Sequence, residues 1–108
     1  MQALPVLQPI CCGPDVEPLA PEAAADLSAR FKALADPTRV AIVNSLSAAA
    51  EVFVCNLTET FDLPQPTISH HLKILREAGL VESSRRGTWA YYRLVPEAVE
   101  ALRAALGG

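Results

Sequence analysis

Three cysteines are the residues of this sequence whose type and spacing most directly suggest chemistry. Cys11 and Cys12 are adjacent in the stretch ICCG, and Cys55 is the only other cysteine in the chain. Thiolates bind soft metal ions and metalloids, and a thiol can also act as a redox centre. The three thiols therefore indicate either a metal or metalloid site or a redox-responsive group.

The surrounding sequence indicates that these thiols are free. The N-terminal stretch MQALPVLQPI contains no Lys or Arg and is interrupted by Pro5 and Pro9, so it lacks the basic start and the continuous apolar run of a signal peptide. We therefore expect a cytoplasmic protein, with no membrane contact because its longest apolar runs are far too short for a span. A reducing compartment keeps thiols reduced, and an odd number of cysteines cannot all pair within one chain.

Charge is unevenly distributed along the chain. The 108 residues carry a formal net charge of −3, yet the segment 63–95 holds five basic and two acidic residues and is +3, which leaves −6 for the remainder. The basic residues of the segment are Lys73, Arg76, Arg85, Arg86 and Arg93. An acidic body with a basic working segment is compatible with a nucleic-acid partner.

The expected organisation divides the chain at residue 21. Five of the nine prolines lie in the first 21 residues, and this density excludes a helix, so residues 1–20 are interpreted as a flexible N-terminal arm carrying the cysteine pair. Residues 21–108 are expected to form one domain. Apolar spacing predicts a helix over 21–35 and a second over 37–47, with Asp36 as its N-cap.

The middle of the chain predicts two helices joined by a tight turn. The first is short, with Asn56 or Thr58 as its cap, and it ends after Phe61. The second extends over 65–78 and ends at Gly79, a residue that commonly follows a helix.

A hairpin and a final helix are predicted to follow. The β-prone runs 80–84 and 88–94 are joined around Arg85, Arg86 and Gly87, and a helix over 96–106 completes the chain. A helix-turn-helix followed by a hairpin with a basic tip is a winged helix-turn-helix, so the predicted fold class is mainly α with a β-hairpin wing.

The second of these two helices has an outward face suited to DNA. Setting the apolar residues Ile68, Leu72 and Leu75 inward turns short hydroxyls, an amide, an imidazole and an ammonium outward, groups that reach base edges and phosphates in a major groove. We expect His71, on the inward flank, to be structural. The alternative is an ordinary solvated helix face with a charged hairpin tip. The predicted DNA-binding residues are Gln65, Thr67, Ser69, His70, Lys73, Arg85 and Arg86.

The sequence resembles the ArsR/SmtB family of bacterial metalloregulatory repressors, and in particular its arsenic-responsive members. The matching stretches are FKALADPTRVAIVNSL, EVFVCNLTETFDLPQPTISHHLKILREAGLV and RRGTWAYYRL. The resemblance implies a homodimer that binds an inverted-repeat operator in double-stranded DNA and releases it when an inducer binds. It places the dimer interface on the first and last helices, whose apolar stripes also need a partner in so small a protein. The predicted interface residues are Leu27, Phe31, Leu34, Val99, Leu102 and Leu106.

The sensing sites familiar in this family are incomplete here. The arsenic site is a Cys-Val-Cys in the first helix of the helix-turn-helix, but this chain has EVFVCNL, so Phe53 replaces the first cysteine and only Cys55 matches. The zinc site uses histidine and carboxylates on the last helix, where this chain offers only Glu97 and Glu100.

The missing thiol has a candidate replacement in the N-terminal pair. Trivalent arsenic and antimony are soft and bind three thiolates in a pyramid. The hypothesis is that Cys11, Cys12 and Cys55 bind As(III), or Sb(III), as the inducer, because the linker 13–21 spans up to about 30 Å when extended. The thiols could belong to one subunit or to two.

Other interpretations of the cysteines stay open. Cadmium or lead could use the three thiolates, whereas zinc usually wants a fourth ligand. A redox or persulfide sensor is the alternative from a different class, and the cysteines could also be incidental. No phosphate loop, nucleophile elbow or paired metal-ligand motif is present, so an enzyme with a catalytic cofactor is not expected.

Overall fold

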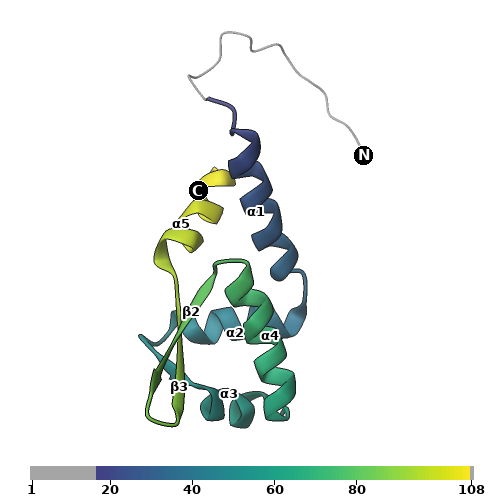
Figure 1. The fold of residues 1–108 in the computed structure, drawn as a ribbon. Helices are drawn as coiled ribbons and strands as arrows, with labels where there is room; N and C mark the ends of the chain where they lie inside the picture. Colours follow the sequence, from purple (N-terminus) through teal and green to yellow (C-terminus); the bar gives the residue numbers. More distant parts are fainter. Residues whose placement is uncertain (1–16, 108) are drawn as a thin grey trace.

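The computed structural model describes residues 17–107. The first and last helices lie side by side at one end of the molecule and run in opposite directions, and the other helices and the hairpin lie at the opposite end (Figure 1). The elements in chain order are α1 (Pro21–Ala33), α2 (Pro37–Ser47), β1 (Val52–Phe53), α3 (Val54–Phe61), α4 (Gln65–Glu77), β2 (Val81–Arg86), β3 (Trp89–Leu94) and α5 (Pro96–Ala105).

The core is centred on α4. Ile68, Leu72 and Leu75 of this helix are fully buried, as their helical spacing predicts. They pack with Ile42 and Leu46 of α2 and with residues from α3 and the start of the wing, in one continuous apolar cluster. Burial of each such side chain contributes about 1.5–3 kcal/mol, so the cluster fixes α4 against the rest of the domain.

The ends of the helices follow from local sequence signals, with one exception. The Asp36 carboxylate accepts a hydrogen bond from the Arg39 backbone N–H at 3.0 Å, which confirms the predicted N-cap of α2. The expectation that Asn56 or Thr58 caps α3 is wrong, because the helix begins at Val54 with Phe53 at the capping position. Pairing of Phe53 in a strand sets the extended backbone that a polar cap would otherwise fix.

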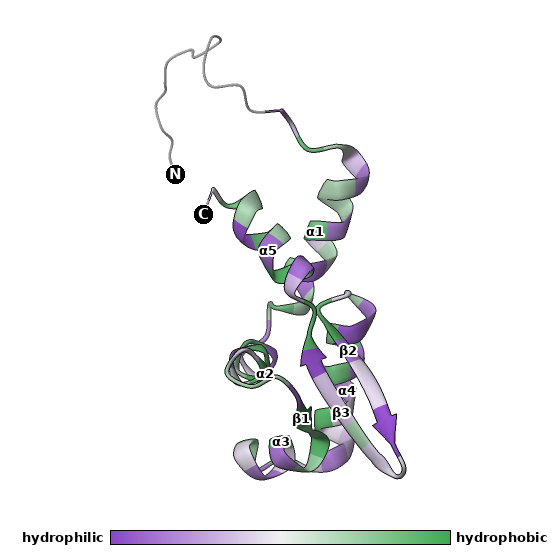
Figure 2. Cartoon of the chain, turned by 90° about the vertical axis from the view of Figure 1, so that its left-hand side faces the viewer, coloured by the Kyte–Doolittle hydropathy of each residue, from purple (hydrophilic) through white to green (hydrophobic). Residues whose placement is uncertain are grey.

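The wing is part of a three-stranded antiparallel sheet with the order β1-β3-β2. The strand β1 was not predicted, and it pairs Val52 with Tyr92 and Phe53 with Tyr91. Arg85 and Arg86 lie in β2 and pair with Ala90 and Trp89, so the hairpin turn is shorter than the sequence suggests. Hydrophilic residues prevail along β2 (Figure 2).

The terminal helices α1 and α5 contact each other. Leu27 and Leu102 are buried within the chain and belong to its core, and Leu34 packs against that core. Phe31, Val99 and Leu106 are exposed on the surface of the protomer. Nowhere in residues 17–107 is there a helix that is both long and apolar enough to cross a membrane.

Candidate nucleic-acid interface and thiol site

The outward face of α4 carries the polar residues that the sequence singled out. Gln65, His70 and Lys73 are exposed, whereas Thr67 and Ser69 are half-buried. They are fixed in direction by the buried stripe on the opposite side of the same helix. The structure thus brings all five side chains to one element, with its polar surface free to enter a DNA groove.

Two arginines from other helices hold α4 at its end and along its flank. The Arg30 Nε of α1 donates to the Ala78 carbonyl at 3.2 Å, next to the C-terminus of α4. Arg39 Nη1 of α2 lies 3.2 Å from His71 Nδ1. His71 is half-buried and lies on the inward flank of α4, as expected. Neither arginine was singled out by the sequence analysis, because neither contact is local in the sequence.

The two arginines of the wing differ in their surroundings. Both are exposed. Arg86 pairs with Glu51 at 2.5 Å, and its guanidinium carbon lies 4.2 Å from the centroid of the Tyr91 ring. The hydrogen bond that Arg86 donates to the Glu51 carboxylate raises the pKa of Arg86 above its ordinary value. Among the ion pairs formed by residues 17–107, none includes Arg85, so its charge is available to a phosphate.

Cys55 is exposed at the second residue of α3. It lines a cavity of about 240 Å³ together with Gln65 of α4 and with Arg85 and Trp89 of the wing. The adjacent Phe53 ring contacts the wing as well, with ring centroids 5.4 Å from Trp89 and 4.4 Å from Tyr91. The thiol therefore lies where α3, the wing and α4, the predicted recognition helix, meet.

The other two candidate thiols, Cys11 and Cys12, lie outside the described residues. Within residues 17–107, no group of three or more His, Cys, Asp and Glu side chains is arranged to hold a metal ion. A site that includes Cys55 must therefore draw further ligands from elsewhere in the chain or from a second copy of it.

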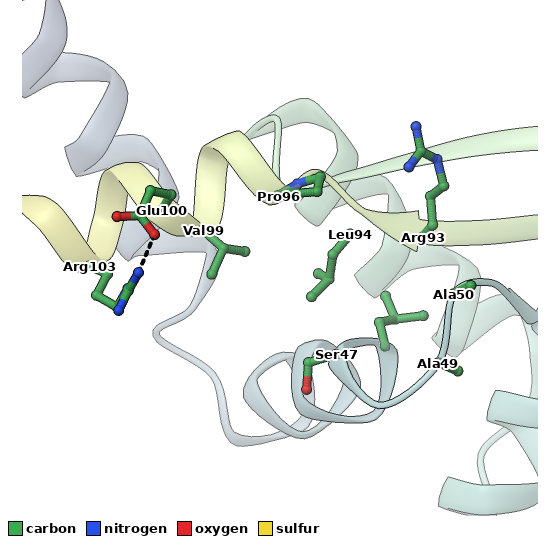
Figure 3. Close-up of a pocket in the computed structure, with 10 residues that line it drawn as sticks. Ser47, Ala49, Ala50, Arg93, Leu94, Pro96, Val99, Glu100 and Arg103 are labelled. Carbon is green, nitrogen blue, oxygen red and sulfur yellow. Dashed lines mark hydrogen bonds and ion pairs between the residues drawn. The ribbon is translucent and has the colours of Figure 1, made fainter. Parts of the chain in front are cut away.

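A larger cavity, of about 520 Å³, lies between α2, the end of β3 and α5. Figure 3 shows its apolar side chains, among them Leu94 and Val99, and the Glu100–Arg103 pair at one edge. The second arginine that lines it, Arg93, is paired with Glu82. Because both cations are already paired, the cavity offers no evident subsite for an anion.

Residues 36–83 match the family model described as "Bacterial regulatory protein, arsR family". The matched region begins at the N-cap of α2 and ends within β2, so it contains the complete helix-turn-helix and the first half of the first wing strand.

The chain is similar to several curated regulators. It is 45% identical over 73 residues to an arsenical resistance operon repressor of Bacillus subtilis, and the aligned region covers 68% of this chain and 70% of that protein. It is 50% identical over 66 residues to the arsenical resistance operon repressor of Escherichia coli, covering 61% of this chain and 56% of that protein. It is also 38% identical over 77 residues to a cadmium resistance transcriptional regulatory protein CadC homolog of Staphylococcus aureus, covering 71% and 64%.

Solved structures have the same architecture. A protein described as a "possible transcriptional regulator for arsenical resistance" superposes with a TM-score of 0.67 at 38% identity, covering 72% of this chain and 80% of that one. The homodimeric winged helix-turn-helix domain Mb0332 of Mycobacterium bovis superposes with a TM-score of 0.68 at 27% identity, covering 82% and 84%. These likenesses confirm the predicted winged helix-turn-helix fold.

Proposed function

The chain belongs to the arsR family of bacterial regulatory proteins, and from that premise we propose that this DNA-binding repressor is released from its operator by trivalent arsenic bound to Cys11, Cys12 and Cys55. Antimony(III) has the same preference for three thiolates and is the second proposed inducer. The relatives named as arsenical resistance repressors support this choice of ligand.

The location of Cys55 is the observation that carries the proposal. Its thiol is exposed in a cavity that it shares with Gln65 and Arg85, two of the proposed DNA contacts. A ligand bound there lies against both the recognition helix and the wing. It can therefore change the placement of these DNA-binding groups.

The helix α3 offers a short route for that change. It packs against α4, and its first residue directly follows β1, which pairs with β3 of the wing. A shift of α3 on ligand binding would alter both contacts. Coupling free energies of about 1–3 kcal/mol are typical of such switches and correspond to roughly 5–150-fold weaker DNA binding.

DNA binding by a homodimer completes the proposal. The proposed DNA contacts are Gln65, Thr67, Ser69, His70 and Lys73 on α4 and Arg85 and Arg86 on the wing. The proposed dimer surface lies on α1 and α5, where the exposed Phe31, Val99 and Leu106 supply most of the free apolar area. The other predicted interface residues support this surface from beneath, because they pack in or against the core of the protomer: Leu27, Leu34 and Leu102. The α4 helices of the two subunits then bind half-sites that lie about one DNA turn apart in an inverted repeat.

The two wing arginines make the DNA contact testable. Arg85→Gln should lower the dependence of log K on log salt by about 1.8, because the dimer loses one phosphate contact in each subunit and each contact contributes about 0.9. Arg86→Gln should lower it less, because Glu51 already holds the Arg86 guanidinium. Equal slopes for wild type and Arg85→Gln in fluorescence anisotropy titrations would remove Arg85 from the interface.

The inducer is tested by the anisotropy of labelled DNA from upstream of the protein's own gene, bound by the fully reduced protein and titrated with arsenite. We expect release near stoichiometric arsenite, and loss of the response in Cys11→Ser, Cys12→Ser and Cys55→Ser with DNA binding intact. Asn56→Ser is the matched control, because this exposed neighbour of Cys55 carries no thiol. An unchanged arsenite response in all three cysteine variants refutes the three-thiol site.

Cadmium is the alternative candidate inducer, favoured by the similarity to the cadmium resistance regulator. Three thiolates with an added water or carboxylate also suit cadmium. A parallel titration with cadmium separates the two metals. Release by an oxidant in the absence of metal would instead assign the cysteines to redox or persulfide sensing.

A further inference from the structure

The guanidinium of Arg39 connects three helices. Its Nε donates to the Ala33 carbonyl, the last residue of α1, at 2.6 Å. Its Nη1 lies 3.2 Å from His71 Nδ1 on α4, and the residue itself is in the first turn of α2. The Arg39 backbone N–H also donates to the Asp36 carboxylate, which holds the start of α2 in place. One side chain therefore fixes the end of α1 and the flank of α4 relative to α2.

The Arg39–His71 contact defines the state of the imidazole. A guanidinium can only donate hydrogen bonds, so His71 Nδ1 must accept. His71 thus serves as an acceptor, a role that an amide oxygen can also fill and that an aliphatic side chain cannot.

The place of His71 on α4 gives the contact its consequence for DNA. His71 lies between the buried Leu72 and the exposed His70 in the sequence, on the flank where the apolar face of the helix meets its polar face. The apolar stripe alone permits small rotations of a helix about its axis, whereas a directional hydrogen bond on the flank does not. Such a rotation would move every base-contacting side chain of α4 together.

We propose that Arg39 and His71 are positioning residues for DNA recognition, which set the rotation of α4 and tie it to the end of α1 without touching DNA. Because α1 belongs to the proposed dimer surface, the same contact relates each recognition helix to its partner across the dimer. The proposal rests on DNA binding by this domain and is independent of the thiol site.

The test compares specific with non-specific DNA binding in the full chain. The specific probe is the tightest-binding duplex from upstream of the protein's own gene, and the non-specific probe has the same length and a scrambled sequence. His71→Leu removes the acceptor, and His71→Asn restores an acceptor oxygen near the position of Nδ1. We expect His71→Leu to weaken specific binding about tenfold and His71→Asn to stay within about threefold of wild type.

Two further readouts separate positioning from other roles. Non-specific affinity and the salt slope should be unchanged in His71→Leu and in Arg39→Gln, because no phosphate contact is lost. The double variant should bind specific DNA about as weakly as Arg39→Gln alone, since Arg39→Gln already removes the contact that His71→Leu breaks. Thermal unfolding identifies any variant that does not fold. If His71→Leu or Arg39→Gln does not fold, the specific DNA binding of His71→Asn and of Arg39→Lys is compared with that of wild type instead.

Three results would overturn the proposal. The first is wild-type specific binding by His71→Leu. The second is a His71→Asn variant that binds as weakly as His71→Leu. The third is a salt slope that falls by about two in Arg39→Gln, one for each subunit of the dimer, which would make Arg39 a phosphate contact. If DNA binding by the variants is as expected but arsenite does not release the DNA, the result counts against the proposed inducer alone.

Discussion

The two helices of the helix-turn-helix are held in very different ways. Helix α4 has three fully buried side chains and is tied to α1 and α2 by Arg30 and Arg39. Helix α3 has eight residues and one buried side chain, Leu57. The helix that is proposed to read DNA is therefore rigidly placed, whereas the helix that carries Cys55 is lightly anchored, which suits its proposed response to a ligand.

The largest expected effect comes from loosening the rigid helix. Leu72→Ala removes a fully buried side chain from the centre of α4 and should lower the free energy of unfolding by about 2–5 kcal/mol. Lys73→Ala, one residue further along and exposed, is the matched control and should change stability by less than about 0.5 kcal/mol. Urea unfolding measures both. Similar stabilities for the two variants would mean that α4 is not anchored by its apolar stripe.

The second effect concerns local opening in the unmodified protein. Backbone amides in the last turn of α3, at Thr58 to Phe61, should exchange with deuterium at least about tenfold faster than those at Leu72 to Arg76 in α4, because fewer buried contacts oppose their opening. Hydrogen exchange followed by mass spectrometry or NMR measures the ratio. Equal protection of the two helices would break the comparison directly.

A third effect tests the Asp36 cap at the start of α2, the helix that carries Arg39. The Arg39 backbone N–H donates to Asp36 and holds the pKa of that carboxyl below its ordinary value. A lowered folded-state pKa stabilises the fold above the unfolded-state pKa, and this contribution disappears as pH falls through the folded-state value. Asp36→Ala should therefore be less stable than wild type at neutral pH, and the difference should shrink in acid.

Asp36→Asn provides the control for that pH dependence. Asparagine also accepts hydrogen bonds at an N-cap but does not titrate. Its thermal midpoint should stay close to that of wild type at neutral pH and fall less on acidification. A gap between wild type and Asp36→Ala that is constant from neutral pH into acid would exclude the carboxylate as the cause.

The smallest effect is expected at the end of α3. Asp62 has a left-handed backbone with φ of 53°, a conformation that glycine adopts without steric cost. Asp62→Gly should raise the free energy of unfolding by about 0.5 kcal/mol, whereas Asp62→Ala should lower it by a similar amount. Urea unfolding with replicate titrations resolves differences of this size. A glycine variant no more stable than the alanine variant would show that Asp62 is not strained.

The sequence predicts the rigidly held helix α4 better than the lightly anchored helix α3. The buried stripe of α4, its start at Gln65 and the turn at Gly79 all follow from apolar spacing and from the backbone freedom of glycine, which has φ of 80° here. These signals are local, so they are visible in a single sequence. The same holds for Asp36 as the N-cap of α2.

The parts that escaped prediction depend on contacts between distant residues. Two residues, Val52 and Phe53, form β1 only because β3 lies beside them, some forty positions further along the chain. The ties from Arg30 to Ala78 and from Arg39 to His71 are likewise non-local. The candidate thiol site was predicted only as a set of residue types, and the cavity that joins Cys55 to Gln65 and Arg85 needed the folded chain.

The cavity beside Cys55 also makes the protein its own optical probe. Trp89 lines that cavity and is the single tryptophan of the chain, so all of its indole emission comes from one place. A heavy, polarisable atom bound at the thiol would quench that emission at short range. Occupancy of the sensor can thus be followed in unlabelled protein, separately from the release of DNA that it is proposed to cause.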